Sequence, residues 1–210
     1  FLPRVLSLGV AWSSDETLWM NRSRNFMLSL QNGEFSETLQ SFHPGVTTMW
    51  LGGISLWAKY KHALSAAPSL RSYPFLSPSN LARMRLTIAI TTGCVVLIAF
   101  FLIQKLLGIK IAAIAGIFIA VDPIYLAQSR RLHTDALAAD FLLLAILTLL
   151  IFLKAPNRLR YLLFSGVCFG LACLSKSNAL VLAFWVPLLL TLSIRQTTFT
   201  IGFSRAIHTF

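Results

Sequence analysis

The chain has 210 residues, of which 56% are hydrophobic and 12% are charged, and its mean hydropathy is +0.73. Soluble domains carry about 25% charged residues, so this composition argues against ordinary water-soluble packing. The net charge of +11 would indicate nucleic acid as a partner of a soluble protein. Here the basic residues lie between apolar stretches, where membrane lipids are the nearer anions, and no nucleic-acid partner is expected.

The first segment, residues 1–11, is apolar but too short to cross a bilayer. We interpret it as the outer end of a truncated first transmembrane helix, and we expect the chain to be a fragment. Residues 12–85 follow as a long polar segment rich in tryptophan. We expect this segment to be an extracytoplasmic loop with juxtamembrane helices.

Two amphipathic helices are predicted in this loop. Apolar residues from Leu18 to Gln31 recur on one side at 100° per residue, and Asn32-Gly33 supplies a stop signal. A second helix is predicted from Val46 to about Tyr60. Tryptophan-bearing helices of this kind lie in the membrane interface. The stretch from Ala66 to Asn80 is rich in proline and serine and predicts a loop.

Five transmembrane helices are predicted within residues 86–195, followed by a tail at 196–210. Their apolar stretches are Leu86–Ile103, Leu106–Val121, Ala136–Leu153, Tyr161–Ser175 and Ala179–Ile194. The second of these requires Lys110 to snorkel and runs into Asp122-Pro123, which predicts a kink. The expected fold class is therefore all-α, a polytopic transmembrane helical bundle with interfacial amphipathic helices in the first outer loop.

The distribution of charge predicts which connections share a side of the membrane. The short connections Gln104–Lys110 and Lys154–Arg160 are rich in lysine and arginine, so they are expected to be cytoplasmic. All seven acidic residues lie in the segments on the opposite side or within about one or two helical turns of them, and that side is expected to be extracytoplasmic. Arg83 and Arg85 flank a span on that outer side and do not fit the rule.

Candidate catalytic residues lie in the outer segments. Asp15-Glu16 follows the first segment directly, where a carboxylate could act as general base toward an acceptor hydroxyl. The alternative is helix capping, because Ser13-x-x-Glu16 fits a capping box, and spacing alone favours the cap.

Candidate binding residues lie further along the chain. His43-Pro44-Gly45 could bind substrate or metal, although a histidine beside a turn more often makes a local hydrogen bond. The segment Arg130-Arg131-Leu132-His133-Thr134-Asp135 could bind phosphate through its arginines, or anchor headgroups while Asp135 caps the next helix. Lys176 could add a phosphate contact or snorkel at a helix end. Asp140 lies inside a span, so it is expected to face protein.

These motifs, in this order, resemble the GT-C membrane glycosyltransferases, in the branch of protein O-mannosyltransferases and aminoarabinose transferases. Asp15-Glu16 is similar to the acidic pair in the first outer loop of that family, and His43-Pro44-Gly45 to its His-Pro element. The segment from Tyr125 to Asp135 resembles its second outer loop. The stretch from Gly170 to Lys176 resembles its Gly-Leu-Ala…Thr-Lys element, with serine for threonine.

The resemblance implies transfer of a hexosyl or pentosyl sugar from a polyprenyl-phosphate donor to a hydroxyl of a protein, lipid or glycan acceptor, on the extracytoplasmic face of the cell membrane. Asp15 would be the base, supported by Glu16. The donor phosphate would be held by Arg130 or Arg131 and by Lys176. His43 and Asp135 would orient substrate or, in some relatives, a divalent metal. His133 would bind substrate.

Two other classes of protein remain open from the sequence. A transporter subunit would also carry charges and kinked helices within the membrane. It should place charge near the bilayer midplane and show repeated halves, whereas here the charges lie at one boundary and no repeat is visible. The third interpretation is an inactive, truncated scaffold.

Overall fold

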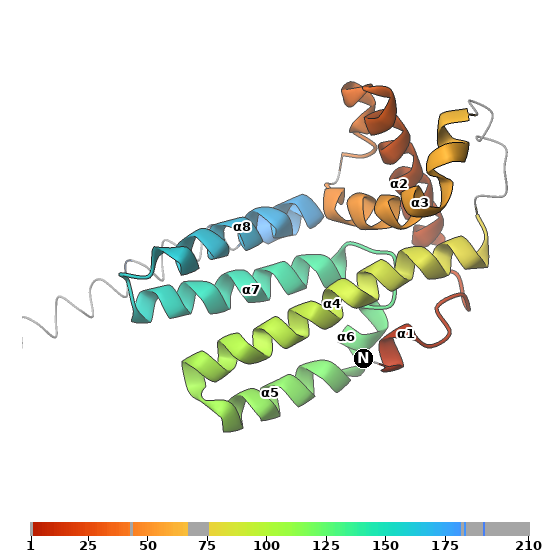
Figure 1. The fold of residues 1–210 in the computed structure, drawn as a ribbon. Coiled ribbons are helices and arrows are strands. Elements are labelled where there is room, and N and C mark those ends of the chain that lie inside the picture. Colours follow the sequence, from red (N-terminus) through yellow and green to blue (C-terminus); the bar gives the residue numbers. More distant parts are fainter. Residues whose placement is uncertain (1, 43, 67–75, 182, 184–190, 192–210) are drawn as a thin grey trace, which may run out of the picture.

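The computed structural model describes residues 2–42, 44–66, 76–181, 183 and 191. Within these residues the chain is built from helices joined by short loops, with no strand (Figure 1). The elements in chain order are α1 (Leu2–Val5), α2 (Ser14–Asn32), the 3-10 helix η1 (Phe35–Thr38), α3 (Val46–Ala66), α4 (Pro78–Leu107), α5 (Ile109–Val121), α6 (Pro123–Gln128), α7 (Asp135–Lys154), α8 (Leu159–Ser175) and the 3-10 helix η3 (Ser177–Leu180).

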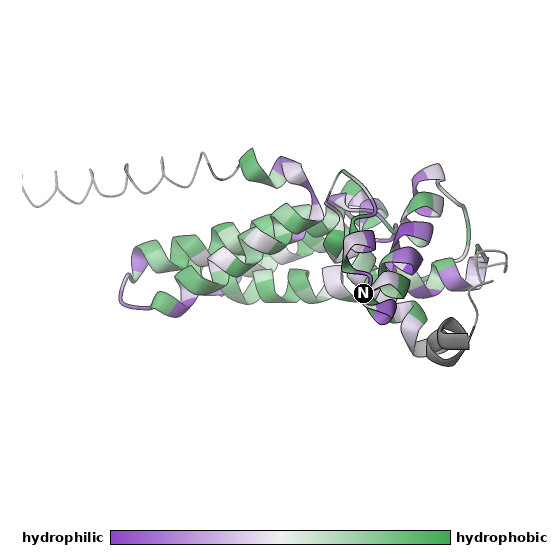
Figure 2. Ribbon diagram, turned by 90° about the horizontal axis from the view of Figure 1, so that it is seen from above, coloured by the Kyte–Doolittle hydropathy of each residue, from purple (hydrophilic) through white to green (hydrophobic). Residues whose placement is uncertain are grey.

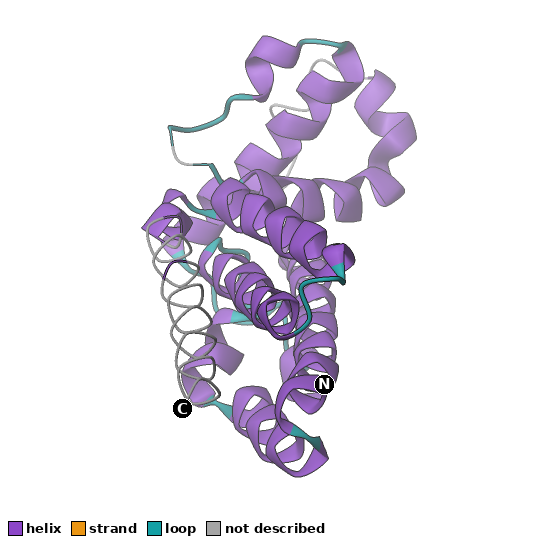
Figure 3. Ribbon diagram, turned by 90° about the vertical axis from the view of Figure 1, so that its left-hand side faces the viewer, coloured by secondary structure: helices purple, strands orange, loops and turns teal. Residues whose placement is uncertain are grey.

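The long helices α4, α5, α7 and α8 run side by side as an elongated bundle, and α2 and α3 lie at one end of it (Figure 1). Figure 3 views the same bundle helices nearly end-on. Between α4, α7 and α8 a cluster of buried residues includes Val95, Ala99, Leu144, Ala145 and Cys168. The small side chains in this cluster let the helices approach closely, which is how helices associate in lipid.

The helices of the bundle consist mostly of hydrophobic residues along their length (Figure 2). Helices α4 and α7 are each long and apolar enough to cross a membrane, and α5 and α8 are shorter apolar helices. In α5 only Ala112 is buried, while large side chains such as Ile114, Ile117 and Phe118 are exposed. An exposed apolar surface of this extent is unfavourable in water and favourable in lipid. The predicted fold class, an all-α helical membrane protein, is confirmed.

The two basic connections meet at one end of the bundle. The α4–α5 connection at Gly108 and the α7–α8 connection lie together at the left in Figure 1. Lys154 Nζ, at the end of α7, donates to the carbonyl oxygen of Leu106 over 3.1 Å, and Lys105 donates to the hydroxyl of Tyr161. The structure therefore gathers these basic residues at the end opposite α2 and α3.

Helix α2 begins and ends at the positions that its capping residues predict. The Ser13 amide donates to Glu16 Oε2 over 3.0 Å, as the capping pattern predicted, and Gly33 ends the helix in the left-handed region with φ +74°. Its apolar face packs on α3 and α4 through Trp19, Met20, Phe26 and Met27. At Gly53 in α3, a Cβ atom would lie 2.1 Å from Met27 Cγ, so this contact requires glycine.

Several predicted boundaries differ from the structure. Helix α4 begins at Pro78, inside the stretch predicted as a loop, because proline is accepted in a first turn and Ser77 caps the amide of Asn80. The predicted span Leu106–Val121 breaks at Gly108, and the predicted kink at Asp122-Pro123 separates α5 from α6. Of the predicted segment 1–11, the described residues 2–11 contain the short helix α1 and no other helix. Most of the predicted span Ala179–Ile194 lies outside the described residues.

Candidate active site at the end of the bundle

A cavity of about 390 Å³ lies where α2 meets the ends of α7 and α8. It is bounded by the first turns of α2, by the loop before α7 and by the segment after α8. Its lining residues are Asp15, Leu18, Trp19, Arg22, His133, Thr134, Ser175, Lys176, Ser177 and Asn178. Three segments that are far apart in the sequence therefore contribute ionisable or polar side chains to one cavity.

Asp15 lies in the first turn of α2, and its side chain is 59% exposed. Its Oδ2 is 3.8 Å from Nε2 of His133, which comes from the loop before α7. The edge of the His133 ring also packs against Trp19, with the ring centroids 6.5 Å apart. The imidazole is thus fixed between a carboxylate and an indole of the same helix.

Asp135 connects the other two ionisable groups of the site. Its Oδ2 is 3.4 Å from Nδ1 of His133, and its Oδ1 is 2.5 Å from Nζ of Lys176. Lys176 follows α8 directly in an extended conformation, which directs its side chain toward the start of α7. Asp15, His133, Asp135 and Lys176 therefore form one continuous row of ionisable side chains.

The wall of the cavity depends on Gly45, in the segment predicted as a candidate site. Gly45 has φ +84°, and a Cβ atom there would lie 2.1 Å from Trp19 Cη2. Its amide donates to the carbonyl oxygen of Leu174 over 2.8 Å, and Thr47 bonds the Ser175 hydroxyl over 2.7 Å. The turn before α3 thus holds α2 and the end of α8 in contact, and this contact requires glycine.

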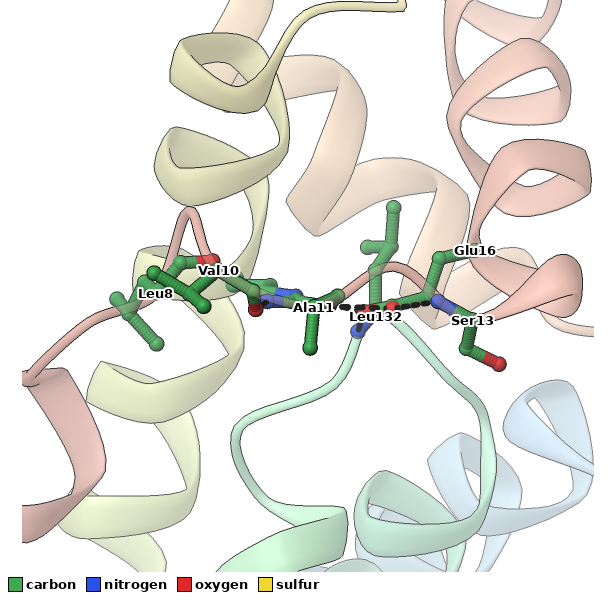
Figure 4. A network of polar contacts seen from close by, with 7 residues as sticks. Leu8, Val10, Ala11, Ser13, Glu16 and Leu132 are labelled. Atoms are coloured by element: carbon green, nitrogen blue, oxygen red, sulfur yellow. Dashed lines mark hydrogen bonds and ion pairs between the residues drawn. The ribbon is translucent and has the colours of Figure 1, made fainter.

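Glu16 does not line the cavity but lies behind it. The residue is 1% exposed, and its carboxylate accepts two hydrogen bonds from Arg85 and one from the amide of Leu132 (Figure 4). Burial alone would raise the pKa of Glu16, but the hydrogen bonds from Arg85 and Leu132 outweigh burial and hold it below the usual value. Glu16 is therefore an ionised, fully paired carboxylate.

Arg130 and Arg131, the two predicted phosphate contacts, do not line this cavity. Arg130 donates to the carbonyl oxygen of Leu6, and Arg131 is exposed. His43 lies outside the described residues. Asp140, as expected, faces protein: it is 1% exposed and accepts a hydrogen bond from Tyr125.

Arg22 is a site residue that sequence reasoning missed. It lies about two helical turns after Asp15 on the same face of α2, with its guanidinium carbon 4.8 Å from the centroid of the Trp19 ring. The helical period could have placed it beside Asp15. Only the tertiary structure brings it to the same cavity as Lys176.

The described side chains of this cavity do not form a ligand set for a divalent metal. Among the described residues, no group of three or more histidine, cysteine, aspartate or glutamate side chains is arranged to hold one. The ammonium of Lys176 is paired with Asp135 Oδ1, an oxygen that would otherwise be a possible metal ligand. We therefore derive no catalytic step through a metal.

The fold and the cavity define a helical membrane protein with an ionisable site at one end of its bundle. Residues 75–204, more than half of the chain, match the family model of dolichyl-phosphate-mannose-protein mannosyltransferase, and the chain belongs to this family. Its general class is that of the membrane glycosyltransferases. Comparison with curated proteins and with solved structures gave no match. His133, Asp135 and Lys176 lie within the matched region, whereas Asp15 and Arg22 precede it.

Proposed function

We propose that the chain transfers a sugar from a polyprenyl-phosphate donor to a hydroxyl group, with the reaction taking place in the cavity between α2, α7 and α8. The observation that carries this proposal is the meeting of an accessible carboxylate, Asp15, with the cations Lys176 and Arg22 around one cavity. A carboxylate suits the activation of a hydroxyl, and cations suit a phosphate leaving group. The name of the chain's family includes dolichyl-phosphate mannose, which is a polyprenyl-phosphate sugar.

In the proposed reaction, the acceptor oxygen attacks the anomeric carbon of the donor sugar. The bond between that carbon and the phosphate oxygen breaks, and its electron pair leaves with the polyprenyl phosphate. Asp15 takes the proton of the acceptor hydroxyl. A base in this position typically contributes about 10² to 10⁴ in rate. Because the Asp15 side chain lines the cavity and is 59% exposed, an acceptor can reach it.

Negative charge accumulates on the phosphate as the bond breaks. Lys176 and Arg22 are the cations that line the cavity, and their attraction for phosphate grows as this charge develops. The guanidinium of Arg22 lies over the Trp19 ring, and a guanidinium that contacts an aromatic ring through its face can still donate hydrogen bonds from its edge. Asp135 holds Lys176 in place and, with Asp15, orients His133. The roles first given to Arg130 and Arg131 stay predictions.

We further infer that α4, α5, α7 and α8 all cross the membrane and that the cavity opens on the extracytoplasmic side. The basic hairpin connections lie at the opposite end of the bundle, where the positive-inside rule places the cytoplasm. A donor held by its polyprenyl chain would enter the cavity from the lipid beside α7 and α8. A charged cavity at one end of the bundle also differs from the midplane site of a transporter.

The proposal is tested by a transfer assay on the full-length protein in proteoliposomes. A polyprenyl-phosphate sugar and the matching nucleotide sugar are supplied in parallel, each with a panel of hydroxyl acceptors. We expect transfer from the lipid-linked donor alone. Transfer from the nucleotide sugar, or from neither donor while the protein remains folded, would contradict the proposed donor class.

A further inference from the structure

Arg85, in the first half of α4, is buried and uses all of its guanidinium nitrogens. Nε and Nη2 donate to the two oxygens of Glu16 over 2.7 and 2.5 Å. Nη1 donates to the carbonyl oxygens of Leu8 and Val10, and Nη2 also donates to that of Ala11. The Arg85 side chain therefore binds both the irregular segment before α2 and the first turn of α2. Figure 4 labels its partners Leu8, Val10, Ala11 and Glu16.

Glu16 extends this network to the loop that carries His133. Its Oε1 accepts the amide of Leu132 over 3.0 Å, and its Oε2 accepts the amide of Ser13 over 3.0 Å. Leu132 precedes His133 in the chain, and Glu16 follows Asp15. The same carboxylate thus fixes the neighbours of both site residues, as Figure 4 shows for Ser13, Glu16 and Leu132.

The segment before α2 that Arg85 binds is irregular. Residues 8–13 lie between α1 and α2, outside any helix, and Ala11 has φ +59°, which is unfavourable for a side-chain-bearing residue. Asp15 and His133 belong to segments far apart in the sequence, and their side chains are 3.8 Å apart. Their separation depends on the contacts between α2 and the loop. The Glu16–Leu132 hydrogen bond is the charged contact that reaches the loop backbone, beside the packing of Trp19 against His133 and of Leu132 in the same buried cluster as Trp19.

Resting on the proposed function, we propose that Arg85 and Glu16 form a positioning pair that sets the distance between Asp15 and His133 in the active site. Neither residue lines the cavity, so neither contacts the substrate there. The pair acts by holding the first turn of α2 against the loop before α7. A displacement of about 1 Å of catalytic groups can cost about 10²-fold in rate, which is the effect we expect from loosening it.

Two conservative variants of the full-length protein test this pair. Glu16→Gln keeps the size of the side chain but removes its charge, and Arg85→Lys keeps the charge but cannot reach all the acceptors. Arg83→Gln is the matched control, because Arg83 is exposed on the same helix close to Arg85. We expect kcat for transfer, per folded molecule, to fall about 100-fold in both variants and not in the control. KM for the donor should not change.

Hydrogen exchange gives a readout that does not depend on activity. In Glu16→Gln the amides of Ser13 and Leu132 lose a charged acceptor, so peptides containing them should exchange faster while peptides from the α7–α8 core keep their protection. Unchanged exchange in these peptides, or a kcat equal to that of Arg83→Gln, would overturn the positioning pair. Loss of protection throughout the chain would also overturn it, since the residues would then be merely structural.

Comparison of Asp15→Asn with Glu16→Gln distinguishes failure of the positioning pair from failure of the proposed function. If Asp15→Asn abolishes transfer while Glu16→Gln leaves kcat unchanged, the function stands and the positioning pair fails. If Asp15→Asn keeps full activity while the exchange of Ser13 and Leu132 rises in Glu16→Gln, the local geometry stands and the assigned reaction fails.

Discussion

Asp135 joins the start of α7 to the end of α8, because its Oδ1 lies 2.5 Å from Nζ of Lys176. The ion pair is partly exposed, with the two side chains 41% and 38% accessible. Exposed pairs contribute little to stability. Its consequence is geometric: it holds the ammonium of Lys176 at the cavity that Asp15 and His133 also line.

Replacement of Lys176 is expected to weaken use of the lipid-linked donor. A charge-assisted hydrogen bond is worth about 1.5–3 kcal/mol, so Lys176→Met should lower kcat/KM about 10- to 100-fold. Lys110→Met is the control, because Lys110 is exposed at the far end of the bundle. Initial rates at varied donor concentration measure the effect. Equal kcat/KM values in the two variants would remove Lys176 from the phosphate site.

Arg22 is expected to contribute mainly to donor binding. Arg22→Gln should raise KM for the donor about tenfold, because the variant loses a cation at the cavity while Asp15 and Lys176 remain. Arg24→Gln changes an arginine of the same helix that does not line the cavity, and it should leave KM unchanged. An equal rise of KM in both variants would indicate a general effect of charge on α2.

The membrane orientation is testable at two asparagines. Asn178 lines the cavity, and Asn157 is exposed in the connection between α7 and α8. In a background without Cys94, Cys168 and Cys173, a membrane-impermeant maleimide added to intact cells should label Asn178→Cys and not Asn157→Cys. The reverse pattern would place the cavity on the cytoplasmic side.

The lowered pKa of Glu16 predicts a specific dependence of stability on pH. A carboxylate with a lowered pKa in the folded state stabilises the protein above its unfolded pKa, and this stabilisation is lost as the pH falls through the folded pKa. Thermal unfolding measured from neutral to acidic pH should therefore show a smaller decrease in Tm for Glu16→Gln than for wild type. Glu37→Gln, which removes an exposed carboxylate, should follow the wild-type curve.

Local signals in the sequence predicted the helices well. The cap at Ser13 and Glu16, the stop at Gly33 and the break at Asp122-Pro123 all depend on residues close together in the chain, and the structure contains each of them. The apolar stretches likewise predicted α4, α7 and α8, because length and hydrophobicity alone decide whether a helix suits lipid.

Local sequence signals could not predict the pairing of Arg85 with Glu16. Arg85 lies beside a predicted span on the outer side, so its charge does not fit the predicted orientation of the protein in the membrane. In the structure it is buried against Glu16, so its charge is neutralised within the protein and says little about sidedness. The pairing joins α4 to α2 and depends on tertiary packing, which residue spacing does not show. Arg130 is a second example. Its guanidinium donates to the carbonyl oxygen of Leu6, a tertiary contact that residue spacing does not show, and Arg130 does not line the cavity.

The central claim of this account is that Asp15 accepts the proton of the acceptor hydroxyl. The most direct measurement is single-turnover transfer by Asp15→Asn in the full-length protein with a saturating polyprenyl-phosphate sugar. Asp122→Asn is the matched control, since Asp122 is an exposed carboxylate that does not line the cavity. We predict a rate about 10² to 10⁴ below wild type for Asp15→Asn, with normal expression and unfolding temperature, and a wild-type rate for Asp122→Asn. Transfer at the wild-type rate by Asp15→Asn would contradict the assignment.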